Sequence, residues 1–336
     1  MESRYTGYAQ VRNVYSPLLL VGIAFVSLGS WLIGYLFSIG FPVYGGVSAA
    51  PFWNMFCQIL TIKEITYLMG FLLMLGGAFL LQKSNYELGL IREKTLLPLF
   101  LNLFLISTNL NFFPLNPASF GVFFLIVAIC NLFMGYHNED ARGTAYNSTL
   151  IVSLGSLLWI HILWFIPLLW HGMFRFRMLT IRTFLASLMG LATIYWFLLG
   201  WCVWTHDFSP FSIFPSLFKI QLLSLGYTDW VNWVGILWVV IITLIAVVNI
   251  ISHDSDDIQR TRQYLYHLIL FGFWSLSLAV LFAQSANEFL QVACIPSSLL
   301  TAHFFTLVRH RFVRWLLYFT FILFVALLSF RLWNFL

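Results

Sequence analysis

The stretch NSTLIVSLGSLLWIHILWFIPLLWHGMF, residues 147 to 174, decides how this chain is threaded. It has 28 residues and no Asp, Glu, Lys or Arg, so it exceeds the roughly 20 apolar residues that one membrane-crossing helix needs. Gly155 and Ser156 lie near its middle, and Pro167 interrupts it later. Two interpretations follow. The stretch is either a re-entrant helical hairpin that enters and leaves on one side, or one long tilted helix that the proline kinks.

The basic residues favour the hairpin, because the cytoplasmic loops of membrane proteins are rich in Lys and Arg. If the N-terminus is cytoplasmic and Asn147–Phe174 is a hairpin, only Lys63, Lys219 and Arg331 of the 17 basic residues lie on the outer side. The other 14 are then cytoplasmic: Arg4, Arg12, Lys83, Arg92, Lys94, Arg142, Arg175, Arg177, Arg182, Arg260, Arg262, Arg309, Arg311 and Arg314. A single crossing would reverse every later loop and remove most of this asymmetry. We therefore predict a multi-pass membrane protein with a cytoplasmic N-terminus and a C-terminus on the outer, periplasmic side.

The composition agrees with a chain that lies in lipid. Of its 336 residues, 61% are apolar and 9% are charged, and the mean hydropathy is +0.89. Soluble domains are about 45–50% apolar and about 25% charged. This chain therefore lacks the polar side chains to cover a water-facing surface, which excludes a soluble enzyme, a disordered tail and a secreted disulfide scaffold. The net charge of +5 is explained by cytoplasmic loops and does not indicate a nucleic-acid partner.

The remaining apolar blocks predict the architecture. They indicate an all-α polytopic membrane protein with about nine full transmembrane helices plus the hairpin Asn147–Phe174. The blocks are Pro17–Gly40, Thr66–Gln82, Thr95–Phe113, Ala118–Tyr136, Thr183–Trp204, Asn232–Ile251, Leu265–Ala283, Asn287–Val308 and Trp315–Trp333. No shift in composition separates them. We expect residues 1–336 to form a single integral-membrane domain without a soluble domain.

Metal and cofactor sites have no local signature in this sequence. It has four widely separated cysteines and no CxxC pair: Cys57, Cys130, Cys202 and Cys294. Four histidines fall inside apolar blocks without an HExxH-like spacing: His161, His171, His267 and His303. We expect buried thiols, no metal and no cofactor.

Acidic residues on the predicted periplasmic side are the candidates for catalysis, because ionisable groups in or beside hydrocarbon are costly and often functional. They are Glu64, Asp207, Asp229 and Glu288. Glu288 opens the block Asn287–Val308, where a carboxylate also stabilises a helix N-terminus through the helix dipole.

Polar residues within the blocks are the candidates for lining a lipid or substrate cavity. They are Asn102, Asn109, His161 and His303, for which hydrogen bonding between helices is the simpler interpretation. Arg331, near the outer end of the last block, is explained by snorkelling to the membrane surface. The patch His253–Asp257 reads as a solvated loop.

Two groups of residues carry a resemblance to known proteins. The first is Tyr146-Asn147, Leu154-Gly155-Ser156-Leu157, Phe165-Ile166-Pro167, Arg175-Phe176-Arg177, Arg182 and Gly190. The second is Asn287-Glu288-Phe289, Pro296-Ser297-Ser298-Leu299-Leu300 and Ala302-His303-Phe304-Phe305. In this order they resemble a family of multi-pass inner-membrane proteins of the Bacteroidota whose function is not known.

The first group is also similar to a segment of the membrane-embedded, type C fold glycosyltransferases that use polyprenyl-phosphate sugars. This resemblance implies glycosyl transfer at the outer side of the inner membrane. Those enzymes carry an acidic residue in their first outer loop, where a base or metal ligand is needed. Here residues 41–63 contain no Asp or Glu, and the first acid is Glu64.

Three functional hypotheses follow. The first is an auxiliary component of the cell envelope that binds a polyprenyl or other lipid and a membrane-protein partner and needs no catalytic residues. The second is a type C-like glycosyltransferase or surface-glycan polymerase with an outer carboxylate site. The third is a transporter or flippase with its site at the hairpin. An outward cavity with carboxylates would favour the second, and a polar cavity around Gly155 and Pro167 would favour the third.

Overall fold

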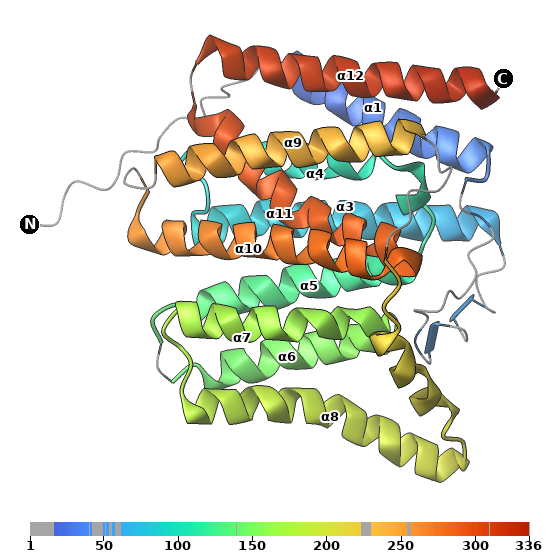
Figure 1. Cartoon of the computed structure of the whole chain (residues 1–336), viewed down its shortest axis with the longest axis vertical. Helices are drawn as coiled ribbons and strands as arrows, with labels where there is room; N and C mark the ends of the chain where they lie inside the picture. The colour runs from blue at the N-terminus through green and yellow to red at the C-terminus, as the bar shows by residue number, and fades with distance from the viewer. Residues whose placement is uncertain are drawn as a thin grey trace, which may run out of the picture.

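The computed structural model describes residues 17–39, 41, 50, 52–53, 56–57, 62–138, 140–222, 230–253, 257–308 and 310–335, and in this part of the chain the fold is an all-α bundle (Figure 1). The α-helices are α1 (Pro17–Leu36), α3 (Lys63–Leu88), α4 (Leu97–Ile106), α5 (Pro117–Met134), α6 (Arg142–Ser156), α7 (Ile166–Arg175), α8 (Ile181–Thr205), α9 (Trp230–Ser252), α10 (Gln259–Leu281), α11 (Ala286–Leu307) and α12 (Arg311–Phe335). Short 3-10 helices connect some of them: η1 (Leu110–Phe112), η2 (Ile160–Phe165), η3 (Ser209–Phe218) and η5 (Ala283–Ser285).

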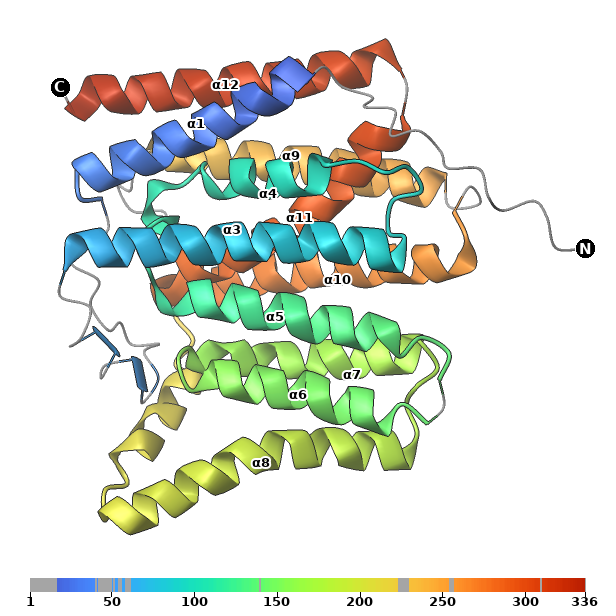
Figure 2. The same ribbon diagram turned by 180° about the vertical axis from the view of Figure 1, so that it is seen from behind.

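Eight of these helices are long and apolar enough to cross a membrane, namely α1, α3, α5, α8, α9, α10, α11 and α12. The shorter apolar helix α4 runs beside them (Figure 2). Large apolar side chains cover the outside of the bundle, for example Trp196 and Trp204 of α8, which are 74% and 84% exposed. A soluble protein does not expose a continuous surface of this kind. The chain is therefore a multi-pass membrane protein, as its sequence predicts.

Hydrogen bonds between helix termini show which loops lie at each of the two ends of the bundle. At one end, Thr261 at the start of α10 donates to the Gly89 carbonyl after α3, and Tyr264 donates to the Phe133 carbonyl near the end of α5. We call this the basic end, because the described Lys and Arg residues, apart from Lys63, Lys219 and Arg331, lie in or beside the helix termini that meet there. At the opposite end, Leu115 before α5 donates its N–H to the Thr66 carbonyl in the first turn of α3.

Helices α6 and α7 form the predicted hairpin and lie side by side in both views (Figures 1 and 2). The chain enters at the basic end, turns at residues 157–159 and returns to the same end, so the single kinked helix is ruled out. Helix α6 begins at Arg142, one turn earlier than the predicted boundary at Asn147. Pro167 lies in the first turn of α7, where its missing N–H removes no helical hydrogen bond. The proline therefore starts a helix instead of kinking one.

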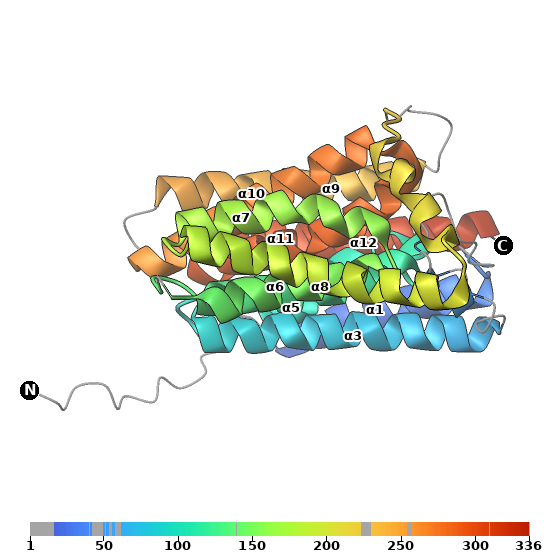
Figure 3. The same cartoon turned by 90° about the horizontal axis from the view of Figure 1, so that it is seen from below.

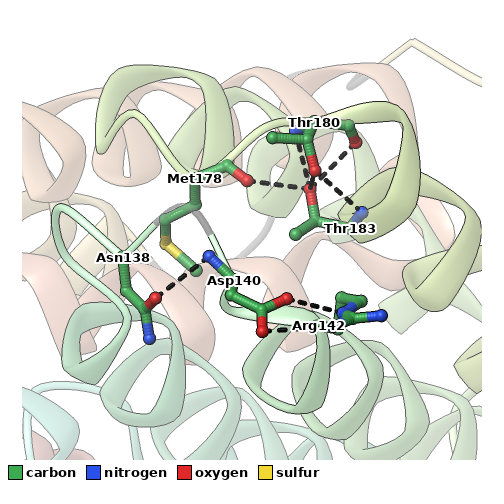
Figure 4. A network of polar contacts seen from close by, with 6 residues as sticks. All are labelled: Asn138, Asp140, Arg142, Met178, Thr180 and Thr183. Carbon is green, nitrogen blue, oxygen red and sulfur yellow. Dashed lines mark hydrogen bonds and ion pairs between the residues drawn. The ribbon is translucent and has the colours of Figure 1, made fainter.

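Polar contacts close the base of the hairpin on both sides (Figure 4). The Arg142 guanidinium donates to both carboxylate oxygens of Asp140, at 2.6 and 3.1 Å. On the other side, Thr180 and Thr183 form a capping box at the start of α8, and the Thr183 hydroxyl donates to the Met178 carbonyl at 2.8 Å. The capping box satisfies backbone N–H groups that the start of α8 leaves unpaired.

The predicted span Thr95–Phe113 is not one continuous helix. Helix α4 ends at Ile106, and the hydroxyls of Ser107 and Thr108 donate back to the carbonyls of Leu103 and Leu105, both at 2.7 Å. Such side-chain bonds compete with the helical ladder and favour a helix end. After this break the chain passes through η1 and enters α5. Helix α4 is therefore a short apolar helix that lies beside the eight long ones.

Arg331 of α12 stabilises this break. It is only 8% exposed, and its guanidinium donates to the Thr108 carbonyl at 2.7 Å and to the Asn232 side chain. A cation at a helix C-terminus is favourable because the last carbonyls carry partial negative charge. Arg331 is thus buried inside the bundle and does not snorkel, which corrects the interpretation from sequence.

Helix α11 is the centre of the bundle (Figure 3). In its most apolar segment 89% of the residues are buried, compared with 22% in α8 and in α12. It contacts α4, α5, α9, α10 and α12. Its polar side chains must therefore find partners inside the protein, either on neighbouring helices or on the carbonyls of α11 itself.

The close contact between α6 and α8 gives a test of this packing. A Cβ atom at Gly190 would lie 2.4 Å from the Tyr146 carbonyl oxygen and 2.4 Å from Thr149 Oγ1, whereas a Cβ atom at Gly200 would meet nothing within 4 Å. Gly190→Ala should lower the free energy of unfolding by about 1–3 kcal/mol, because the two helices must separate. Gly200→Ala, on the same helix, should be neutral or stabilising by up to about 1 kcal/mol. Thermal unfolding in detergent micelles measures both variants, and equal effects would contradict this packing.

Candidate functional site

The candidate amides of α4 and η1 bond helix α11. The Asn102 side chain donates to Ser298 Oγ at 3.3 Å, and the Asn109 side chain donates to Asn287 Oδ1 at 3.2 Å. Both asparagines are 1% exposed. A third pair, which the sequence did not suggest, joins Asn116 at the start of α5 to Gln291, at 3.1 Å. These bonds form a polar seam along α11, and their geometry is that of interhelical hydrogen bonds.

The candidate carboxylates lie on separate elements. Glu64 is exposed in the first turn of α3 and accepts a 3.4 Å hydrogen bond from the Tyr35 hydroxyl. Asp207 is exposed after α8, where the N–H and hydroxyl of Ser209 donate to it at 2.8 Å and hold the pKa of Asp207 below its usual value. Asp229 lies outside the described residues. The structure thus does not bring Glu64 and Asp207 to one site.

Glu288 is the most enclosed of these acids. It lies in the first turn of α11 and accepts a 2.6 Å hydrogen bond from Trp159 Nε1 at the tip of the hairpin. Trp159 is fully buried, and its ring lies so close to α5 that a Cβ atom at Gly121 would be 2.4 Å from it. Glu288 therefore anchors the tip of the hairpin to the first turn of α11, at the end of the bundle opposite the basic end.

His161 lines a small cavity beside this anchor. The other residues that line it are Ser216, Lys219, Gln221, Phe282, Gln284 and Ser285. The imidazole contacts the rings of Phe282 and Phe289, with centroids 5.3 and 5.9 Å away. This cavity contains no described carboxylate, so it lacks the acid that a glycosyl-transfer site needs.

His303 belongs to an ion cluster at the basic end. Its Nε2 lies 3.2 Å from Asp257 Oδ2, and the Nε of Arg92 lies 2.9 Å from Asp257 Oδ1. The Asp257 side chain is 4% exposed. Burial alone would raise the pKa of Asp257, but His303 and Arg92 outweigh it and hold the pKa below its usual value. The patch that reads as a solvated loop thus ends in a buried carboxylate that joins α11 to the segments before α4 and α10.

An apolar groove lies between α9 and α10, and its floor is formed by α11 and the α4–η1 break. We call it the α9–α11 groove; it contains about 770 Å³ of empty space. Its wall residues include Ile236, Val240, Leu244, Val247, Ile269, Phe273, Leu276, Leu290 and Leu300. Leu244 and Phe273 at its rim are 42% and 48% exposed, so the groove opens toward the surroundings of the bundle.

Small side chains create this groove. The middle of the groove is lined by small residues, whereas larger residues such as Leu290, Leu300 and Phe273 line the rest of it. The small residues are Ala293, Cys294 and Ser297 of α11 and Gly272 of α10. Ala293 and Ser297 are four residues apart and therefore share one helix face. Small residues at this spacing usually let two membrane helices approach closely. Here the space remains open, because α9 stands apart from α10 over this face.

The groove residues were not among the sequence candidates, which were chosen for polarity. The spacing of Ala293 and Ser297 was the available signal, but it is equally typical of direct helix contact.

Among the described residues, no group of three or more His, Cys, Asp or Glu side chains is arranged to hold a metal ion.

Asp257 gives a pH-dependent test of the ion cluster. Because its pKa is lower in the folded state, its ionisation stabilises the fold above the ordinary value of 3.8, and this contribution is lost as the pH falls below that value. Asp257→Asn should cost about 1–3 kcal/mol at neutral pH and flatten the loss of stability below about pH 5. Thermal unfolding between pH 3 and 7 measures this, with the exposed Glu64→Gln as the control. Identical pH profiles for the wild type and Asp257→Asn would contradict the role of this carboxylate.

Comparison of the chain with models of protein families, with curated protein sequences and with solved structures finds no match.

Proposed function

We propose that this protein is a lipid-binding auxiliary component of the bacterial cell envelope, and that the α9–α11 groove holds the hydrocarbon chain of a membrane lipid. The groove itself is the observation that carries the proposal. It is lined almost entirely by apolar side chains and opens between two helices that are apolar enough to cross a membrane. The lining offers water few polar partners, so a hydrocarbon chain is the occupant that it favours.

The length of the groove suits one chain. Its lining extends from Leu290 to Leu300 on α11 and from Ile236 to Val247 on α9. At 1.5 Å per residue, each of these stretches measures roughly 15 Å, which is about half the hydrocarbon thickness of a bilayer. The groove therefore accommodates an extended chain from one leaflet. A phospholipid and a polyprenyl lipid both offer such a chain.

Two observations favour an auxiliary role over the other hypotheses. The described acids Glu64 and Asp207 are exposed on different elements, and Glu288 is bonded to Trp159, so no outward carboxylate pair supports glycosyl transfer. A Cβ atom at Gly155 would meet Ile162 at 2.7 Å and Phe124 at 3.2 Å. An apolar, filled hairpin interior does not support a transport site at this position.

The charge distribution supports an orientation in the inner membrane. The basic end carries the described Lys and Arg residues apart from Lys63, Lys219 and Arg331. We therefore place the basic end and the N-terminus in the cytoplasm, and the end of α12 on the periplasmic side.

Filling the groove tests the proposed function. The double variant Ala293→Leu/Ser297→Leu adds side-chain volume to the groove floor, and Val203→Leu adds it to a lipid-facing position on α8 as a control. The proteins are equilibrated with a phospholipid that carries a photoreactive diazirine in its acyl chain, and crosslinked peptides are identified by mass spectrometry. Crosslinks should concentrate on α9, α10 and α11 in the wild type and fall about tenfold in the double variant, a change of about 1.4 kcal/mol.

Two further results complete this test. Crosslinks spread over all lipid-facing helices, with no change in the double variant, would contradict a defined chain site. Competition by an unlabelled polyprenyl phosphate, compared with an unlabelled phospholipid, identifies which of the two chains the groove prefers.

Cysteine labelling tests the orientation. Gly143 is exposed at the basic end and Ser212 is exposed in η3 at the opposite end. In a background without the four native cysteines, Ser212→Cys should react with a membrane-impermeant maleimide in intact spheroplasts, and Gly143→Cys should react only after lysis. The reverse pattern would place the basic end in the periplasm.

A further inference from the structure

A second groove lies on another part of the bundle surface, between α3 and α6 over α5. We call it the α3–α6 groove; it contains about 860 Å³ of empty space and shares no lining residue with the α9–α11 groove. Its lining residues are Leu80, Lys83, Ser84, Glu87, Ile126, Val127, Cys130, Asn131, Met134, Asn147, Leu150 and Ile151. Helices α3, α5 and α6 lie toward the viewer in Figure 2, whereas α9 and α10 lie toward the viewer in Figure 1.

The lining of this groove changes from polar to apolar with depth. Lys83 and Glu87 lie in the last two turns of α3, Asn131 lies in the last turn of α5, and Asn147 lies in the second turn of α6. All four are therefore near the basic end. The residues one to two turns farther from that end are apolar, among them Leu80, Ile126, Val127, Leu150 and Ile151. A glycerophospholipid has the same gradient from head group to acyl chain.

The charged part of the groove is an ion pair of one lysine and one glutamate on α3. Lys83 Nζ lies 3.6 Å from Glu87 Oε1, and the two side chains are 69% and 48% exposed, so both reach a ligand at the mouth. The side-chain nitrogen of Asn131 donates to the Thr144 carbonyl and to Ser148 Oγ, both at 3.0 Å. These bonds fix the amide, and its oxygen has no partner among the described residues. The mouth thus offers one cation, one anion and an oriented amide oxygen.

We infer that the α3–α6 groove binds a zwitterionic glycerophospholipid, whose head group carries a phosphate and a primary ammonium. Lys83 pairs with the phosphate, Glu87 with the ammonium, and the acyl chain lies on Ile126, Val127 and Ile151. The ammonium or a glycerol-linked donor also suits the Asn131 oxygen. An anionic lipid without an ammonium satisfies Lys83 but leaves its phosphate beside Glu87, a like-charge contact that is unfavourable.

Exchange between two lipids tests this inference. The protein is equilibrated in micelles with equal amounts of phosphatidylethanolamine and phosphatidylglycerol that have identical acyl chains, and the retained lipids are counted by native mass spectrometry. The wild type should retain phosphatidylethanolamine about threefold over phosphatidylglycerol, a modest preference because exposed ion pairs contribute little binding free energy. Glu87→Gln should remove or reverse this preference, because it leaves Lys83 as the only charge of the pair. Lys83→Gln should reduce retention of both lipids.

Matched controls lie on the same helix. Lys63 and Glu64 form an adjacent opposite-charge pair in the first turn of α3, away from the groove. Lys63→Gln and Glu64→Gln should leave the lipid ratio unchanged, and thermal unfolding confirms that each variant is folded. Soluble glycerophosphoethanolamine, which has no acyl chain, should not displace the bound lipid.

The outcomes separate this site from the α9–α11 groove. An unchanged lipid ratio in Glu87→Gln, a wild-type preference for phosphatidylglycerol, or displacement by the soluble head group would each overturn the inference. Ala293→Leu/Ser297→Leu should not alter the head-group preference, because the two grooves share no lining residue. Failure at one groove is therefore distinguishable from failure at the other.

Discussion

A backbone amide or carbonyl that lies in hydrocarbon must find its partner inside the protein, and the irregular parts of this fold depend on that constraint. The chain departs from regular α-helix at the hairpin tip and at the break after α4. At the tip, the Leu157 carbonyl accepts from the Phe52 N–H, and Trp159 bonds Glu288. At the break, Thr108 bonds its own segment through its hydroxyl, and its carbonyl accepts from Arg331. The protein can turn and interrupt its helices because the groups exposed at each departure find partners elsewhere in the protein.

The same constraint explains why α11 carries so many polar residues at the centre of the bundle. A surrounded helix can keep amides only where neighbouring helices supply partners, as Asn102, Asn109 and Asn116 do. Each of these bonds fixes the rotation of α11 relative to α4, η1 or α5. With its rotation fixed, α11 turns Ala293 and Ser297 toward the space between α9 and α10. The polar seam therefore sets the position of the apolar groove, although it does not line it.

The two grooves differ in which parts of a lipid their linings contact. The α9–α11 groove presents shape and apolar surface alone, which suits a chain but discriminates weakly among head groups. The α3–α6 groove combines apolar depth with a charged pair near the basic end, so it adds head-group chemistry. Chain burial provides binding free energy, and the ion pair provides selectivity of smaller magnitude. Under our proposal, the two grooves hold lipids at defined places on the surface of the bundle.

The sequence by itself determined the membrane class and the distribution of basic residues, and it favoured the hairpin Asn147–Phe174 over one kinked helix, because hydropathy, block length and charge are properties of consecutive residues. It did not determine pairings between distant residues. Asp257 reads as part of a solvated loop until the fold buries it against His303, and Arg331 reads as a surface cation until it reaches Thr108. The sequence singled out Asn102 and Asn109 as polar residues within apolar blocks, but it did not give their partners on α11. The grooves were decided by the tertiary structure alone, since empty space between helices depends on how far apart side chains from four or five segments hold them.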